Sequence, residues 1–98
     1  MYAVRSIRES GGAAESATDQ ETVEAIKLLA KTEGIFAEPA GAVAIAALKK
    51  LVETGEVAVD EVIVCYVTGN GLKTPEAVSA QIPKPIEIEP KLEALKLA

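Results

Sequence analysis

The sequence predicts an α/β fold, because strand-like and helix-like patterns alternate along its 98 residues. The first observation is residues 62–67, a continuous run rich in β-branched side chains that is typical of a strand covered on both faces. The second is residues 40–48, an all-apolar stretch that indicates a helix buried all round. Because so short a chain has difficulty covering such a helix, we expect it to be one part of a larger body.

The first elements are marked by their boundaries. Residues 2–9 predict a strand from their Val, Ile and Tyr content, and a Ser-Gly-Gly sequence then breaks it. Thr18 and Glu21 have the spacing of a capping box, which predicts a helix that runs to about Glu33 and ends at Gly34. The apolar side chains at helical spacing on the expected buried face are Val23, Ile26, Leu29 and Ala30.

The remaining elements follow in order. Residues 35–37 predict a very short extended segment, and Pro39 starts the apolar helix, which Gly55 closes. After the strand at 62–67, Lys73 to Glu76 predict a short turn or helix. The chain therefore divides into a domain at residues 1–82 and a Pro-rich tail at residues 83–98, which ends with a short amphipathic piece through Leu92, Leu95 and Leu97.

Composition excludes several classes of function. The hydrophobic share of 49% excludes a disordered chain, and a net charge of -5 without a basic cluster argues against nucleic acid or an anionic membrane as partner. One cysteine and no histidine predict no metal site and a cytoplasmic location. Residues 39–48, the longest nearly apolar stretch, are too short to span a bilayer.

The sharpest candidate site is the sequence Thr68-Gly69-Asn70-Gly71 after the expected buried strand. Ligands of open α/β sheets bind beyond the carboxyl ends of strands, and glycines there permit positive φ and close backbone approach. We expect the Thr68 hydroxyl to face that crevice. The alternative is that Asn70 and Gly71 form only a tight turn, which the dipeptide alone favours.

A second candidate is Glu38, at the start of the apolar helix. Its carboxylate either caps the helix or contacts a ligand. The physics of helix capping alone favours the cap. Cys65 is expected to be a small core residue rather than a nucleophile, because no base adjoins it in the sequence. No residue is assigned a catalytic role.

Residues 17–42 and 65–73 together resemble the carboxyl-terminal part of the threonine synthase family, within the fold-type II pyridoxal-phosphate enzymes, of which threonine dehydratase is a close relative. The resemblance extends from about Val4 to the tail and rests on two motifs in the expected order, Glu-Pro-Ala-Gly and Thr-Gly-Asn-Gly-Leu-Lys. It implies a partial three-layer open sheet with helices, in a carboxyl-terminal fragment of such an enzyme.

The resemblance also implies roles for the candidate residues. Thr68 matches the hydroxyl residue that hydrogen-bonds the pyridine nitrogen of pyridoxal phosphate, a contact that does not hold the nitrogen protonated. Gly69 and Gly71 would shape the loop, and Glu38 would lie near the cofactor ring. Thr74 departs from the pattern, since an Asp commonly follows the Lys.

Such enzymes convert O-phosphohomoserine and water to threonine and phosphate. No stretch of the sequence resembles their cofactor-binding lysine segment or phosphate loop. We therefore expect the chain alone to be inactive and not to retain the cofactor. Its expected partner is the missing amino-terminal portion, or a second copy that associates through apolar surface, with Ala42, Val43, Ala46 and similar residues at or near the contact.

Two alternatives belong to other functional classes. A free-standing α/β regulatory module would bind an amino acid without pyridoxal phosphate and dimerise through its apolar surface. A purely structural subunit would bind another polypeptide and no ligand. Calorimetric titration with amino acids separates the first alternative from the enzyme fragment.

Overall fold

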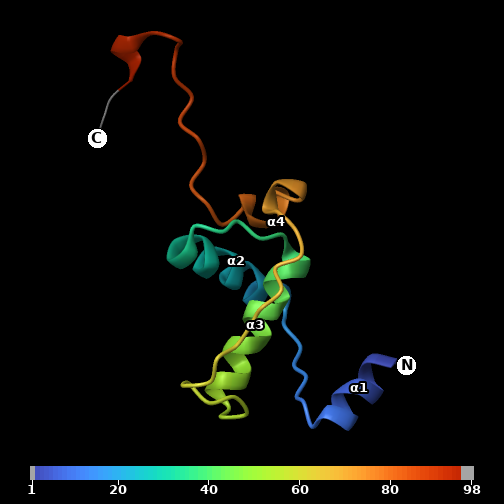
Figure 1. Cartoon of the computed structure of the whole chain (residues 1–98). Coiled ribbons are helices and arrows are strands. Elements are labelled where there is room, and N and C mark those ends of the chain that lie inside the picture. Colours follow the sequence, from blue (N-terminus) through green and yellow to red (C-terminus); the bar gives the residue numbers. More distant parts are fainter. Residues whose placement is uncertain (1, 96–98) are drawn as a thin grey trace.

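The computed structural model describes residues 2–95, and within them the ordered elements are helical. They are α1 (Tyr2–Ser10), α2 (Asp19–Glu33), α3 (Pro39–Glu53), the 3₁₀ helix η1 (Gly71–Lys73), α4 (Glu76–Ser79) and the 3₁₀ helix η2 (Leu92–Ala94). In Figure 1, α2 crosses α3 at the centre, while α1 and the carboxyl-terminal tail extend away from them. The Cα radius of gyration is 18.0 Å, whereas a compact chain of this length has about 13 Å.

No strand or sheet forms anywhere in residues 2–95, so the predicted α/β fold with a partial three-layer open sheet is wrong for this chain. Residues 62–67 are extended but outside any ladder, and the β-pairing in this part of the chain is one isolated antiparallel bridge between Ala37 and Asn70. A strand needs a neighbour to bond its N–H and C=O groups, and residues 2–95 bring no second strand beside this segment. The alternative of a free-standing α/β regulatory module required the same α/β fold, which residues 2–95 do not form.

The amino-terminal strand prediction is also wrong, because residues 2–9 lie in helix α1. Arg5 and Glu9 face each other across one turn, with 2.7 Å between Nε and Oε1. The helix ends where Gly11 takes a φ of +68° and the Gly12 N–H donates to the Ile7 carbonyl at 2.9 Å. No side chain of α1 is buried. Local hydrogen bonds therefore decide its conformation, not a neighbouring strand.

Helix α2 has the boundaries that its sequence predicts. The Glu21 N–H donates to the Thr18 hydroxyl at 3.2 Å, and the Glu21 carboxylate accepts from the Thr18 N–H at 2.7 Å, which completes the capping box. Gly34 ends the helix with a φ of +69°. Ala30 is exposed, contrary to expectation, and the buried residues of α2 are Thr22, Val23, Ala25, Ile26 and Leu29.

Helix α3 begins as predicted, with Pro39 in its first turn, and is followed by Gly55 at a φ of +77°. The prediction of burial all round is wrong: the buried residues of α3 are Gly41, Ala42 and Ala46. Only one long helix, α2, packs against it within the described chain. Ala42 and Ala46, predicted to lie at or near a self-association contact, are buried inside the chain, whereas Val43 is exposed. The contact itself stays a prediction.

The hydrophobic core is small. Its buried members are Val23, Ala25, Ile26, Leu29, Ala37, Ala42, Ala46 and Val78, contributed by α2, α3, α4 and the segment before α3. Half of them are alanine, which buries little apolar area on folding. The contact between α2 and α3 therefore depends on polar contacts as well.

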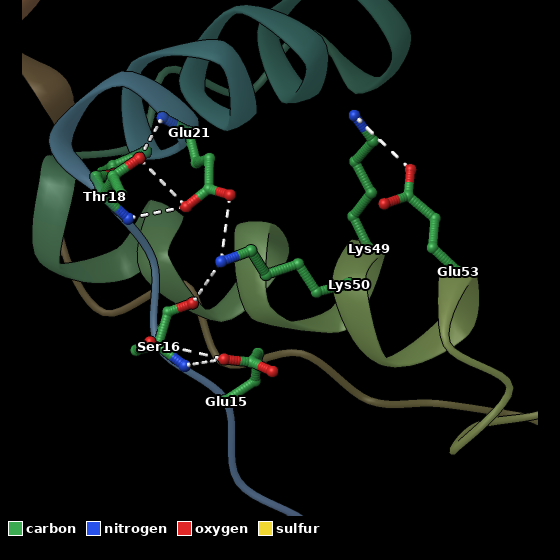
Figure 2. Close-up of polar contacts among 8 residues, drawn as sticks. Glu15, Ser16, Thr18, Glu21, Lys49, Lys50 and Glu53 are labelled. Carbon is green, nitrogen blue, oxygen red and sulfur yellow. Dashed lines mark hydrogen bonds and ion pairs between the residues drawn. The ribbon is translucent and has the colours of Figure 1, made fainter.

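A lysine of α3 makes the main polar contact to the start of α2. Lys50 Nζ lies 2.9 Å from Glu21 Oε1 and donates to the Ser16 carbonyl at 2.9 Å, so it joins the capping box to α3 (Figure 2). The hydrogen bond from the Thr18 N–H, and then that from Lys50, lower the pKa of Glu21 from 4.5 to about 2.

The tail beyond α4 is extended and exposed, with η2 near its end. Leu92 and Leu95 of the predicted amphipathic piece are exposed, and Leu97 lies outside the described residues. The division of the chain between residues 82 and 83 stays a prediction. Within residues 2–95 no helix combines the length and apolar character needed to cross a membrane.

We expect Glu21→Gln to change the acid stability of the chain. Because the pKa of Glu21 is lowered by folding, its contribution is present above about pH 4.5 and is lost as the pH falls toward 2. The variant should unfold at a lower temperature at neutral pH and should lose less stability between those two pH values. Thermal melts followed by circular dichroism measure both effects.

Glu24→Gln is the matched control, since Glu24 is an exposed carboxylate of the same helix and accepts a hydrogen bond from Gln20 Nε2 at 2.9 Å. It should melt like the original chain. An unchanged acid transition in Glu21→Gln would show that the ionised Glu21 carboxylate, with its bonds to Thr18 and Lys50, does not stabilise the fold.

Candidate functional site

The structure brings together the two motifs that the sequence singled out. The Glu38 N–H donates to the Gly69 carbonyl at 3.0 Å, and the Gly71 N–H donates to the Phe36 carbonyl at 2.8 Å. These bonds flank the bridge between Ala37 and Asn70. Two segments far apart in the sequence, 36–38 and 69–71, therefore lie side by side, and we call this contact the motif junction.

The glycines of the loop are explained by close contact. A Cβ atom built on Gly69 would overlap the Glu38 carboxylate, and one built on Gly71 would overlap the Phe36 ring. Neither glycine has a positive φ, so the expectation that glycine is needed here for a left-handed backbone does not apply to them. Both positions are small because side chains of residues 36–38 fill the adjacent space.

Glu38 does not act as the expected cap. It is the N-cap residue of α3 by position, but its side chain makes no capping hydrogen bond. Its Oε2 lies 2.7 Å from Lys73 Nζ instead, and the side chain of Glu38 is only 13% exposed while that of Lys73 is 67% exposed. Sequence reasoning missed Lys73, because nothing in the order of residues shows that 38 and 73 meet.

Thr68 lies at the edge of the motif junction. Its side chain is exposed, as are those of Val64 and Tyr66 earlier in the extended segment. Its backbone N is close to α3: a Cβ on Gly41 would be 3.1 Å from it. The first turn of α3 thus supports the backbone of Thr68 and leaves its hydroxyl open to solvent.

Asn70 and Gly71 also form the tight turn that their sequence predicts. The Asn70 Oδ1 accepts from the Leu72 N–H at 2.9 Å and caps η1. A tight turn and a loop that presents Thr68 are therefore compatible. Close by, the Thr74 Oγ1 is buried and has no hydrogen-bond partner within the described residues.

Cys65 is half-buried and not a full core residue. It lines an open groove of about 370 Å³ between α3 and the extended segment, beside Leu48, Ile63 and Tyr66. In Figure 1 this segment returns along α3 toward α4. Within the described residues no acidic, cysteine or histidine cluster could hold a metal ion.

Comparison with known proteins places the chain among relatives of one kind. The family described as "Pyridoxal-phosphate dependent enzyme" matches residues 1–69. The threonine synthase of Methanocaldococcus jannaschii is 54% identical over 94 residues, which are 96% of this chain and 23% of that protein. The threonine synthase of Methanosarcina acetivorans is 45% identical over 96 residues, 98% of this chain and 24% of that protein. The chain spans about a quarter of the length of the relatives it matches.

We expect Gly71→Ala to destabilise the motif junction. The new Cβ would overlap the Phe36 ring, and such overpacking costs about 1–3 kcal/mol. Chemical denaturation followed by circular dichroism measures the loss. Combining it with Phe36→Leu, which removes the aromatic ring, should recover part of that cost, and additive effects in the double variant would contradict the contact.

Proposed function

The chain belongs to the pyridoxal-phosphate dependent enzyme family, and on that premise we propose that it supplies the side of a threonine synthase active site that faces the cofactor ring. The proposed reaction of the complete enzyme converts O-phosphohomoserine and water to threonine and phosphate. The observation that carries the proposal is the motif junction, where Glu38, Gly69 and Gly71 meet beside Thr68. Its threonine synthase relatives support the choice of reaction.

The residues present fit one end of pyridoxal phosphate. An exposed hydroxyl on a supported backbone, as at Thr68, suits a ring nitrogen, since it can donate or accept a hydrogen bond. The phosphate end needs cationic or backbone N–H donors, and the cation nearest the loop, Lys73, is already paired with Glu38. The proposed site is therefore shared with polypeptide that holds the phosphate end.

Each residue has a specific proposed role. The Thr68 hydroxyl bonds the ring nitrogen without a fixed charge, Gly69 and Gly71 keep the loop close to residues 36–38, and Glu38 forms the wall beside the loop. Pyridoxal phosphate, when bound, supplies the electron sink for the reaction. We assign no catalytic residue to this chain, because no lysine in it has the context of the family's cofactor lysine.

The exposed apolar surface supports a partner polypeptide. Val62 is 98% exposed, Val64 76% and Tyr66 80%, all within one extended segment. Continuous apolar surface of this kind is rare on soluble monomers. We propose that the remainder of the enzyme covers it, that the chain alone does not retain the cofactor, and that the complete enzyme is cytoplasmic and oligomeric.

The role of Thr68 can be tested in a chimera in which this chain replaces the 94 matching residues of the Methanocaldococcus jannaschii threonine synthase. Thr68→Val keeps the shape of the side chain and removes the hydroxyl, so we expect weaker cofactor binding and a changed absorbance spectrum of the bound cofactor. Threonine formation should fall by about tenfold, since leaving a polar group without its hydrogen bond costs about 1–3 kcal/mol.

Thr74→Val in the same chimera is the matched control. The Thr74 Oγ1 is buried without a partner, so its removal should leave the cofactor spectrum unchanged and stability equal or slightly higher. If Thr68→Val kept both turnover and spectrum, the proposed role would be wrong. An unaltered chimera that folds and forms no threonine would contradict the proposed function.

The uncovered surface gives a separate prediction for the chain alone. We expect it to self-associate in analytical ultracentrifugation, because water is excluded when outward-facing apolar side chains meet. Val64→Lys should shift the distribution toward monomer. Val59→Lys is the control, since Val59 is 89% exposed but lies in the loop before this segment. A monomeric original chain at all concentrations would contradict the prediction.

A further inference from the structure

We propose that Lys73 is a positioning residue for the cofactor-facing loop, acting through its ion pair with Glu38. The inference rests on the proposed function, because the loop it would hold is the one that carries Thr68. Sequence patterns assign no role to this lysine, and it lies outside the residues 1–69 that match the family. The positioning role follows from what the Glu38 carboxylate contacts.

The Glu38 carboxylate has contacts on two sides. On one side it fills the space that a side chain at Gly69 would occupy, and on the other its Oε2 lies 2.7 Å from Lys73 Nζ. The carboxylate is largely shielded from water, whereas the ammonium group is largely solvated. A shielded carboxylate without its cation loses its main compensation for desolvation.

Loss of the Lys73 charge should therefore let the Glu38 carboxylate turn toward water or toward the first turn of α3, where negative charge is also favoured. Either movement takes the carboxylate away from Gly69. The loop would then keep the two backbone hydrogen bonds of the motif junction but lose the side chain packed beside it.

Thr68 is one peptide bond from this contact. The Gly69 carbonyl accepts from the Glu38 N–H, and the Thr68 N packs on Gly41 of α3. A shift at Gly69 consequently moves the backbone that orients the Thr68 hydroxyl. Since an exposed side chain such as Lys73 contributes little to the core, its effect should be local to the motif junction.

Amide hydrogen exchange of the 98-residue chain, measured by NMR, tests the proposal without any cofactor. Lys73→Met keeps most of the stem and removes the charge, and we expect the Glu38 and Gly71 amides to exchange about fivefold faster. Amides in the middle of α2 should not change. Lys73→Arg should restore the original rates, because a guanidinium can also bond the carboxylate.

Two further variants distinguish the place of the Glu38 carboxylate beside Gly69 from a general effect of removing a lysine charge. Lys84→Met removes an exposed lysine of the extended tail and should leave both amides unchanged. Gly69→Ala retains both charges but places a Cβ where the carboxylate lies, so it should speed exchange as Lys73→Met does. Unchanged rates in Lys73→Met, or an equal acceleration of the α2 amides, would overturn the proposal.

The two proposals can fail separately. If Lys73→Met loosens the motif junction but Thr68→Val leaves the cofactor spectrum of the chimera unchanged, the proposed function is wrong and the positioning contact stands. If the exchange rates do not respond to Lys73→Met while Thr68→Val alters the spectrum, Lys73 has no positioning role and the proposed function stands.

Discussion

The motif junction is the constraint on which the carboxyl-terminal half of the structure depends. Two backbone hydrogen bonds and an isolated bridge hold residues 69–71 against residues 36–38. The extended segment before them has no ladder of its own, and η1 and α4 follow directly after them. The junction thus sets where the chain returns to α3 and, with it, the place of Thr68.

The helical half is held differently. Its core is small and rich in alanine, so the crossing of α2 and α3 combines modest apolar burial with the contacts of Lys50 to Glu21 and Ser16. An elongated shape and a β-branched segment exposed on its outer side accompany this small core. Both features fit a chain that spans about a quarter of its relatives' length. Apolar surface that the rest of a longer protein would cover is exposed when that part is absent.

Local signals in the sequence predicted what local interactions decide. The capping box of Thr18 and Glu21, the terminating Gly34 and the proline at the start of α3 all lie where expected, because each acts within one helical turn. The strand predictions failed for the opposite reason. Residues 62–67 have strand propensity, but a ladder needs a partner strand, and the described residues supply none. Residues 2–9, the other predicted strand, form a helix instead.

The sequence by itself determined the family resemblance, the helix boundaries and the identity of Thr68, Gly69, Gly71 and Glu38 as residues of interest, since motifs and caps are written in consecutive positions. Only the tertiary structure decided that Glu38 pairs with Lys73 and fills the space beside Gly69. It also decided which face of α3 is buried. These outcomes depend on which segments far apart in the sequence come into contact, and local sequence patterns do not show those contacts.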